Sequence, residues 1–156
     1  MAGHSDNELA LPDFATPPRV AVVIAPYYTA ISKAQMASVR AVMARGGAEF
    51  EVIEVPGSLE IGPAITLLEK AGGFDGYVAL GCVIRGATSH YDIVINESAR
   101  AITELGLRGA LIGNGIITVE NKAQAEERAD AGRLNTAGAA AEAVLHLIGL
   151  KWRLEQ

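Results

Sequence analysis

The sequence is poor in the features that build disulfide scaffolds, membrane spans and nucleic-acid interfaces. It holds one cysteine, Cys82, and a single thiol cannot form an internal disulfide, so a reducing compartment suits the chain. No apolar run approaches the length of a membrane helix, and residues 1–18 lack the order of a secretory signal. The 13 lysines and arginines are scattered among 18 acids, which argues against nucleic acid as a partner. We expect a cytoplasmic protein that binds neither nucleic acid nor membranes.

Half of the 156 residues are hydrophobic, which is enough for the core of one domain. Prolines and polar residues predict an extended or disordered tail over 1–18, followed by a single domain over 19–156. Apolar runs bounded by glycine or proline alternate with segments of helical periodicity. Strands are predicted at 19–25, 50–55, 77–84 and 110–118, the last broken by Gly113 and Gly115, and helices at 31–45, 59–70, after Ser89, after Asn121 and at 136–152. This alternation predicts an α/β fold: a three-layer αβα sandwich with a four-stranded parallel sheet, flavodoxin-like.

Ligands of such folds bind beyond the carboxyl ends of the strands. Tyr27 and Tyr28 directly follow the first strand, and they are either surface aromatics or a stacking platform for a flat ring. Glu60 lies in the first turn of a predicted helix, where the helix dipole alone explains a carboxylate. The loops that we expect to matter are 26–30, 56–60, 82–90 and 113–121.

The richest loop runs from Arg85 to His90. A glycine-containing turn that opens onto a helix presents free backbone N–H groups, which bind anions, although an ordinary capped helix has the same pattern. Ser89 and Asp92 have the spacing of a capping box. His90 follows at once, where the positive end of the helix dipole favours the neutral imidazole, so it could accept and return a proton. Asp92 either orients His90 or completes the cap.

Two further residues have competing interpretations. Cys82 is either a nucleophile or a small apolar residue at a strand end, and its apolar neighbours favour the second. Arg128 either reaches the anion site or is a solvated side chain among acids. The sequence contains no metal-binding cluster and no nucleotide-binding fingerprint. The residues alone thus predict a protein that binds a flat, anionic small molecule, with His90 as acid and base.

Three segments resemble the lumazine synthase family: VPGSLEI at 55–61, ALGCVIRGATSHYDIVINESA at 79–99 and GIITVENKAQAEERA at 115–129. The resemblance extends from residue 19 to the C-terminus. It implies condensation of 5-amino-6-ribitylamino-2,4(1H,3H)-pyrimidinedione with 3,4-dihydroxy-2-butanone 4-phosphate, the penultimate step of riboflavin biosynthesis. It implies neither a cofactor nor a metal.

The resemblance also assigns roles by position. Tyr27 matches the aromatic residue that stacks on the substrate ring, and His90 matches the proton donor and acceptor. Arg128 matches an arginine that binds phosphate from an adjacent subunit. The remaining matched positions are Ser58, Leu59 and Glu60 for the ribityl chain, Cys82, Val83 and Ile84 for the pyrimidine, and Ala87 and Thr88 for the phosphate.

The sequence departs from the family pattern at three positions. Asn114 replaces a common phenylalanine, Thr136 a common lysine and Tyr28 a common asparagine, so we expect activity with a higher KM. The resemblance implies a homopentamer, and the short segment 131–137 favours an icosahedral capsid of twelve pentamers, with riboflavin synthase as a candidate partner. The alternatives are a non-catalytic shell or flavin-binding relative, and an unrelated phosphosugar-binding protein.

Overall fold

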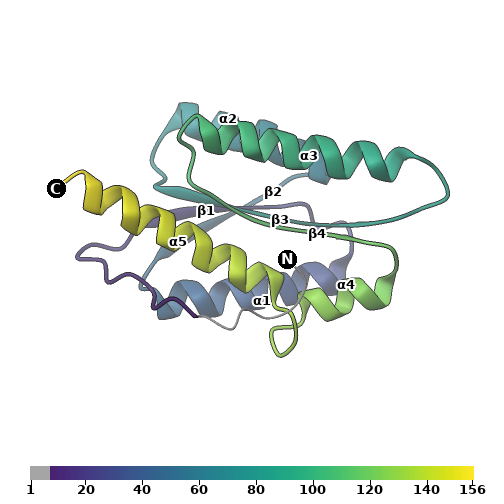
Figure 1. Ribbon diagram of the computed structural model, residues 1–156, viewed down its shortest axis with the longest axis horizontal. Coiled ribbons are helices and arrows are strands. Elements are labelled where there is room, and N and C mark those ends of the chain that lie inside the picture. The colour runs from purple at the N-terminus through teal and green to yellow at the C-terminus, as the bar shows by residue number, and fades with distance from the viewer. Residues whose placement is uncertain (1–7) are drawn as a thin grey trace.

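The computed structural model describes residues 8–156. Its single sheet has four parallel strands in the order β2–β1–β3–β4 (Figure 1). This is the order of the first four strands of the flavodoxin-like fold. The strands are β1 (Arg19–Ile24), β2 (Glu49–Glu54), β3 (Gly76–Ile84) and β4 (Ile112–Val119). All four predicted strands are therefore present, with small shifts at their ends.

Five α-helices cover the two faces of the sheet. Figure 1 shows α2 and α3 on one face and α1, α4 and α5 on the other, so the predicted three-layer α/β sandwich is confirmed. Residues 59 and 60, predicted as the start of a helix, belong instead to a separate 3-10 turn, η1 (Ser58–Glu60), before α2. The helices are α1 (Thr29–Arg45), α2 (Ile61–Ala71), α3 (His90–Leu107), α4 (Lys122–Ala129) and α5 (Thr136–Leu154).

The two central strands, β1 and β3, are buried along most of their length because helices cover both sides of them. Side chains alternate between the two faces, as the pleat of a strand requires. Val20, Val22 and Ile24 enter a core shared with α1 and α5. Ala21 and Val23 enter a second core, shared with α2 and α3.

The two glycines of β4 were predicted to break the strand, and this prediction is wrong. β4 is continuous, and its pairing with β3 runs through both positions. The glycines instead allow α5 to pack closely on the strand. A Cβ atom at Gly113 would lie 1.9 Å from the carbonyl oxygen of Ala140, and one at Gly115 would lie 3.1 Å from the Cβ of Ala140.

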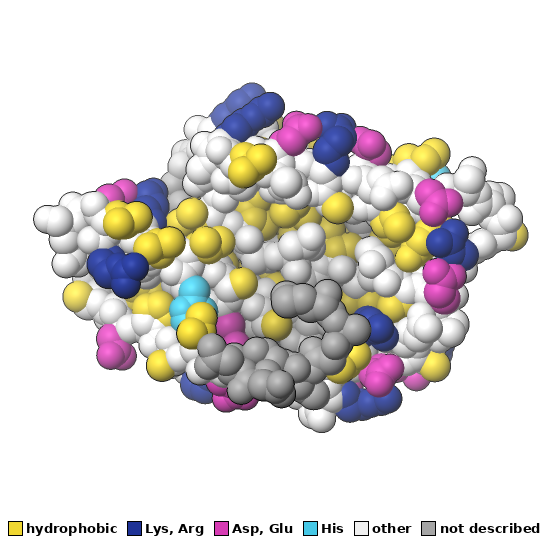
Figure 2. Space-filling view, viewed as in Figure 1, with side chains coloured by type: hydrophobic (Ala, Val, Ile, Leu, Met, Phe, Trp, Pro, Cys, Tyr) yellow, Lys and Arg dark blue, Asp and Glu magenta, His cyan; other side chains and the backbone are white. Residues whose placement is uncertain are grey.

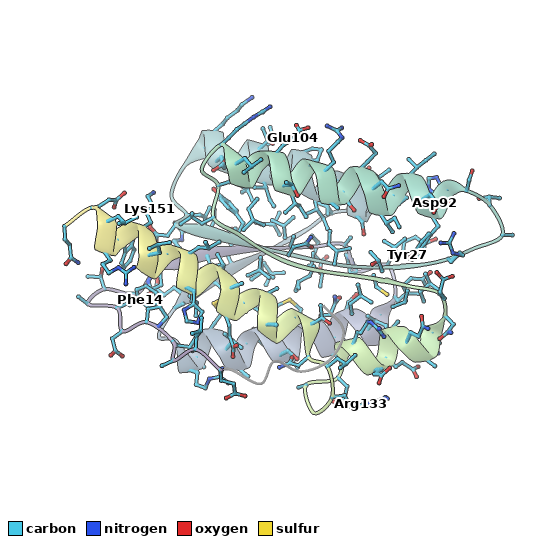
Figure 3. All side chains as sticks on the ribbon, viewed as in Figure 1. Phe14, Tyr27, Asp92, Glu104, Arg133 and Lys151 are labelled. Carbon is cyan, nitrogen blue, oxygen red and sulfur yellow. The ribbon has the colours of Figure 1, made fainter. Side chains whose placement is uncertain are left out.

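The segment from residue 8 to residue 18 forms no helix or strand and packs against the end of α5. Phe14 lies beside α5 (Figure 3), and its ring meets Trp152 edge-on, with 5.3 Å between the ring centroids. The part of the predicted tail at residues 1–7 lies outside the described residues. None of the helices within residues 8–156 has both the length and the apolar character that crossing a membrane requires. Figure 2 shows acidic and basic side chains interspersed on the face that it presents.

Candidate active site

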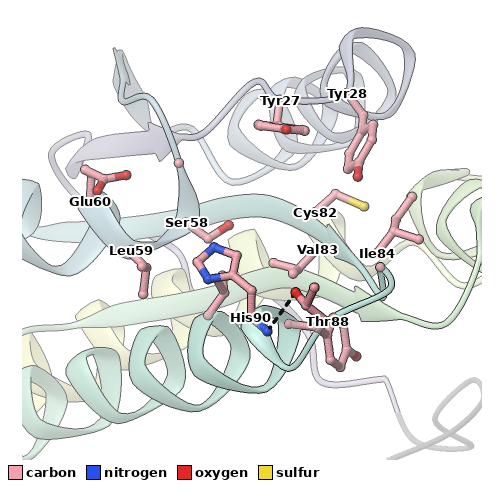
Figure 4. Close-up of a pocket in the computed structure, with 14 residues that line it drawn as sticks. Tyr27, Tyr28, Ser58, Leu59, Glu60, Cys82, Val83, Ile84, Thr88 and His90 are labelled. Atoms are coloured by element: carbon pink, nitrogen blue, oxygen red, sulfur yellow. Dashed lines mark hydrogen bonds between the residues drawn. The ribbon is translucent and has the colours of Figure 1, made fainter.

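A cavity of about 410 Å³ opens beyond the carboxyl ends of the strands (Figure 4). It lies where β1 and β3 are neighbours, and from these strands the chain leaves toward opposite sides of the sheet. Parallel sheets bind ligands at such a switch point, because the two departing loops leave a crevice between them. The lining consists of Tyr27, Tyr28, Gly57, Ser58, Leu59, Glu60, Cys82, Val83, Ile84, Gly86, Thr88, His90, Tyr91 and Val94.

Tyr27 and Tyr28 form an aromatic wall opposite the start of α3 (Figure 4). Their rings meet edge to face, with 5.0 Å between centroids and 69° between planes. Tyr27 is 72% exposed, so a face of its ring is free for a ligand. Tyr28 is half-buried, and its carbonyl accepts hydrogen bonds from the backbone N–H and the hydroxyl of Ser32. Burial, followed by the neighbouring Cys82 and Tyr27, raises the pKa of Tyr28.

The segment after β2 supplies polar groups to the cavity. Ser58 is buried, whereas Leu59 and Glu60 are exposed at the opening. A side chain at position 81 would collide with Ser58, because a Cβ at Gly81 would lie 2.7 Å from its hydroxyl oxygen. The glycine in β3 therefore makes room for the hydroxyl group at the pocket wall.

Cys82 lies at the end of β3 and packs with apolar residues of α1, β4 and α4. Burial raises the pKa of its thiol to about 11. The thiol is therefore protonated at neutral pH and is a poor nucleophile, which supports the structural interpretation of this residue over the catalytic one.

A buried glutamine that the sequence analysis missed binds the backbone of β3 next to Cys82. Gln35 of α1 is fully buried, and its side-chain amide donates to the carbonyls of Gly81 (2.9 Å) and Gly115 (3.2 Å). One side chain thereby connects α1 to β3 and β4, next to the end of β3 that lines the cavity. A polar residue among the apolar positions of the α1 stripe was the only sequence signal for this role.

The third predicted loop reaches the pocket through Gly86, Thr88 and His90. His90 is the first residue of α3, and its backbone N–H donates to the hydroxyl oxygen of Thr88 at 3.4 Å. The predicted capping box is wrong, since Ser89 makes no side-chain cap and only its carbonyl accepts from the Asp92 N–H. The Asp92 carboxylate lies 3.5 Å from the Arg85 guanidinium instead.

Three predicted site residues lie outside the lining. Ala87 is part of the turn but does not face the cavity. Asn114 accepts a hydrogen bond from the backbone N–H of Ile116, and Arg128 donates to the Gln124 carbonyl of its own helix. A single chain therefore does not bring Asn114 or Arg128 to its own pocket.

The lining includes two α3 residues that were not predicted, Tyr91 and Val94. Val94 lies four residues after His90, so both project from one helix face, and this spacing could have identified it. Within residues 8–156, no three His, Cys, Asp or Glu side chains gather closely enough to hold a metal ion. The cavity joins an aromatic wall, hydroxyl groups, a carboxylate and an imidazole, which suits a flat ring with a polar chain.

The fold and this pocket define a flavodoxin-like α/β protein that binds a small molecule at the switch point of its sheet. Residues 17–151 match the sequence profile of the 6,7-dimethyl-8-ribityllumazine synthase family. The chain is 67% identical over 150 residues to the 6,7-dimethyl-8-ribityllumazine synthase of Jannaschia sp. (strain CCS1), covering 96% of this chain and 84% of the relative. It is 48% identical over 132 residues to that of Novosphingobium aromaticivorans, covering 85% and 95%. The chain belongs to this family of riboflavin biosynthesis and is a transferase.

Proposed function

We propose that the protein condenses 5-amino-6-ribitylamino-2,4(1H,3H)-pyrimidinedione with 3,4-dihydroxy-2-butanone 4-phosphate. The products are 6,7-dimethyl-8-ribityllumazine, phosphate and water, in the penultimate step of riboflavin biosynthesis. One observation carries the proposal: a single cavity is lined by an exposed aromatic ring, a hydroxyl-and-carboxylate segment, a strand-end backbone and a histidine beside a glycine-containing turn. These are the groups that a flat ring, a ribityl chain and a phosphate would need.

The pyrimidine substrate binds between the aromatic wall and the end of β3. Tyr27 stacks on the ring, which its 72% exposure permits. The backbone of residues 82–84 contacts the polar edge of the pyrimidine. Ser58, Leu59 and Glu60 hold the ribityl chain, whose hydroxyl groups can donate to the Glu60 carboxylate and exchange hydrogen bonds with Ser58.

The phosphate of the second substrate binds at the turn of Ala87 and Thr88. Backbone N–H groups at the start of α3 and the helix dipole favour an anion there. The amine of the pyrimidine attacks the ketone to form an imine with loss of one water, phosphate is eliminated, and the ring closes with loss of a second water. His90 accepts and returns the protons that these steps exchange. No cofactor or metal takes part.

The site is completed by an adjacent subunit. Arg128 and Asn114 lie outside the pocket of their own chain, which supports their delivery to a neighbour's pocket in a homopentamer. A guanidinium there binds phosphate through paired hydrogen bonds. The short segment 131–137 favours assembly of twelve pentamers into an icosahedral capsid, with riboflavin synthase as a partner. The protein acts in the cytoplasm, and residues 19–156 form its one domain.

The test is lumazine formation from the two purified substrates, followed by absorbance against an enzyme-free blank. We expect His90→Ala to lower kcat and Arg128→Ala to raise the KM for the butanone phosphate. His146→Ala and Arg108→Ala are matched controls: His146 lies outside the pocket, and Arg108 is an exposed arginine at the C-terminal end of α3 whose only ion pair within residues 8–156 is with Glu104. The blank matters because part of the reaction proceeds without a catalyst.

A wild-type rate no faster than the blank would refute the proposal. A non-catalytic shell or flavin-binding protein would then be favoured, and Asn114→Phe and Thr136→Lys would be the first reversions to make. Light scattering tests the assembly independently. A particle of pentamer size alone would exclude the capsid while leaving the enzymatic proposal intact.

A further inference from the structure

Arg85 contacts both ends of the turn that precedes α3. Its backbone N–H donates to the Val119 carbonyl at 2.9 Å, which extends the pairing of β3 with β4. Its Nε donates to the Glu120 carboxylate at 2.7 Å. Beyond the turn, its Nη1 lies 3.5 Å from the Asp92 carboxylate, and its guanidinium carbon lies 4.2 Å from the centroid of the Tyr91 ring. One side chain thus joins the ends of two strands to the first turn of α3.

The turn between these anchor points, residues 86–89, has few contacts of its own. All four residues are exposed. A Cβ at Gly86 would meet no atom within 4 Å. The hydrogen bonds given by the structure here are local ones, from the His90 N–H to Thr88 and from the Asp92 N–H to Ser89. The position of the turn relative to the sheet therefore depends on the residues that flank it.

The Arg85 guanidinium interacts with side chains of this chain on several sides. Two carboxylates, those of Glu120 and Asp92, face it, and its plane lies over the Tyr91 ring. A single exposed ion pair contributes little to stability, but a planar fork can serve two carboxylates and an aromatic face at once. A lysine ammonium at the same position could not reproduce this arrangement.

The Glu120 anchor is itself fixed. Its backbone N–H donates to the side-chain oxygen of Gln124 at 2.9 Å, and the side chain of the next residue, Asn121, caps α4 by accepting from the Gln124 N–H. The Tyr91 side chain, in the first turn of α3, is buried and lines the pocket. Arg85 therefore connects the start of α3 to Glu120, whose position is set independently of the turn.

We infer that Arg85 is a positioning residue for the synthase reaction, which holds the turn of residues 86–89 and the start of α3 in place without contacting substrate. The inference rests on the proposed function, in which that turn binds phosphate and His90 transfers protons. It predicts that loss of the Arg85 contacts weakens phosphate binding more than pyrimidine binding. The reason is that the pyrimidine is held from the other side of the cavity, by Tyr27 and the segment after β2.

The experiment compares Arg85→Gln and Arg85→Lys with Arg100→Gln. Arg100 pairs with two carboxylates of its own helix, Glu97 and Glu104, so it matches the chemistry of Arg85 without spanning a turn. We expect both Arg85 variants to raise the KM for the butanone phosphate by roughly tenfold. This is less than the roughly hundredfold loss that a displacement of binding groups by about 1 Å can cause. The KM for the pyrimidine should stay within about twofold, and Arg100→Gln should leave both constants unchanged.

A second measurement does not depend on catalysis. Hydrogen exchange of peptides covering residues 86–92 should be faster in Arg85→Gln than in wild type, while peptides from β3 and β4 exchange as before. Unchanged KM values with an active wild type would overturn the inference and leave the proposed function standing. An inactive wild type would remove the proposed function, and exchange alone would then decide whether Arg85 holds the turn. Faster exchange throughout the chain, with a lower Tm, would mean a general structural role and would also overturn the inference.

Discussion

The contact between β4 and α5 makes the substitution Gly113→Ala the strongest structural test of the fold. The added Cβ would lie 1.9 Å from the carbonyl oxygen of Ala140 and 2.7 Å from its carbonyl carbon. Real Cβ contacts are not shorter than 3.0 Å, so β4 and α5 must separate by at least 3.0 − 1.9 = 1.1 Å. Both partners are backbone, so no rotation of a side chain can relieve the collision.

The cost follows from what α5 buries. Its inner face contributes six fully or nearly fully buried side chains to the core, and a gap of about 1 Å forfeits up to about half of each dispersion contact. These residues are Ala137, Ala140, Ala141, Val144, Leu145 and Ile148. We expect Gly113→Ala to lower the free energy of unfolding by about 3 kcal/mol, the upper end of the range for overpacked cores. For a chain of this size the Tm should fall by roughly 6 to 12 °C.

Urea unfolding at a fixed protomer concentration measures this, because subunit assembly makes stability depend on concentration. The single tryptophan, Trp152, lies on α5 and reports on that helix, while circular dichroism reports on the whole fold. Gly106→Ala is the matched control. Gly106 lies in α3 with no atom within 4 Å of an added Cβ, so the same change should be neutral or stabilise by up to about 1 kcal/mol.

Equal stability of the two glycine variants would refute the packing argument. A loss below about 1 kcal/mol for Gly113→Ala would also do so, because it would mean that α5 can move off β4 at little cost. A loss seen by Trp152 fluorescence but not by circular dichroism would indicate local detachment of α5 instead of cooperative unfolding.

Three further substitutions test separate parts of the structure. Burial holds the Cys82 thiol protonated, so its contribution to stability is complete below its ordinary pKa of 9.0 and is lost as pH rises toward about 11. As pH rises across that range, the wild type should therefore lose about 2 kcal/mol of unfolding free energy relative to Cys82→Ala. Asn135 caps α5 by accepting from the Gly138 N–H and has a left-handed φ of 47°, so Asn135→Ala should cost about 1 to 2 kcal/mol in urea unfolding. Gln35→Leu removes both hydrogen bonds from α1 to β3 and β4 and should cost about 2 kcal/mol by the same measurement.

Each of these three predictions has a control variant or an outcome that would contradict it. A pH-independent difference between wild type and Cys82→Ala would show that the thiol is not desolvated. Asn135→Gly keeps the left-handed backbone accessible and loses only the cap, so it should cost less than Asn135→Ala. Gln35→Glu tests the donor directly, since a carboxyl group can donate one hydrogen bond when it is protonated and none when it is ionised, whereas the amide donates to both carbonyls. A Glu variant as stable as wild type would contradict the hydrogen-bond assignment.

The order of elements could be predicted because the local pattern and the tertiary environment agree. The run at 19–24 is almost continuously apolar, and it forms a strand that is buried on both faces. The sequence did not separate the 3-10 turn at residues 58–60 from the helix predicted at 59–70, since such turns are frequent at the N-termini of helices and continue directly into them. The sequence analysis also misinterpreted the glycines of β4. Glycine is required there because α5, a helix some 25 residues further along the chain, packs closely on the strand.

The candidate site was predictable as a set of loops but not as a set of contacts. The carboxyl ends of parallel strands must meet at one edge, so loops after β1, β2 and β3 could be assigned to one place from the sequence. The partners of individual side chains depend on geometry across the sheet. Asp92 was predicted to cap α3 or orient His90, yet it faces Arg85. The role of Gln35 depends on two strands that are distant in sequence.

The sequence by itself determined the class of fold, the family and three of the loops that line the cavity, because hydrophobic periodicity and turn residues act over a few positions. Only the tertiary structure decided which groups share the cavity, and that Asn114 and Arg128 lie outside the pocket of their own chain. Only it shows that Arg85 spans the turn before α3. These relations depend on the stacking of strands and helices that are far apart along the chain, and no local pattern encodes the distances between them.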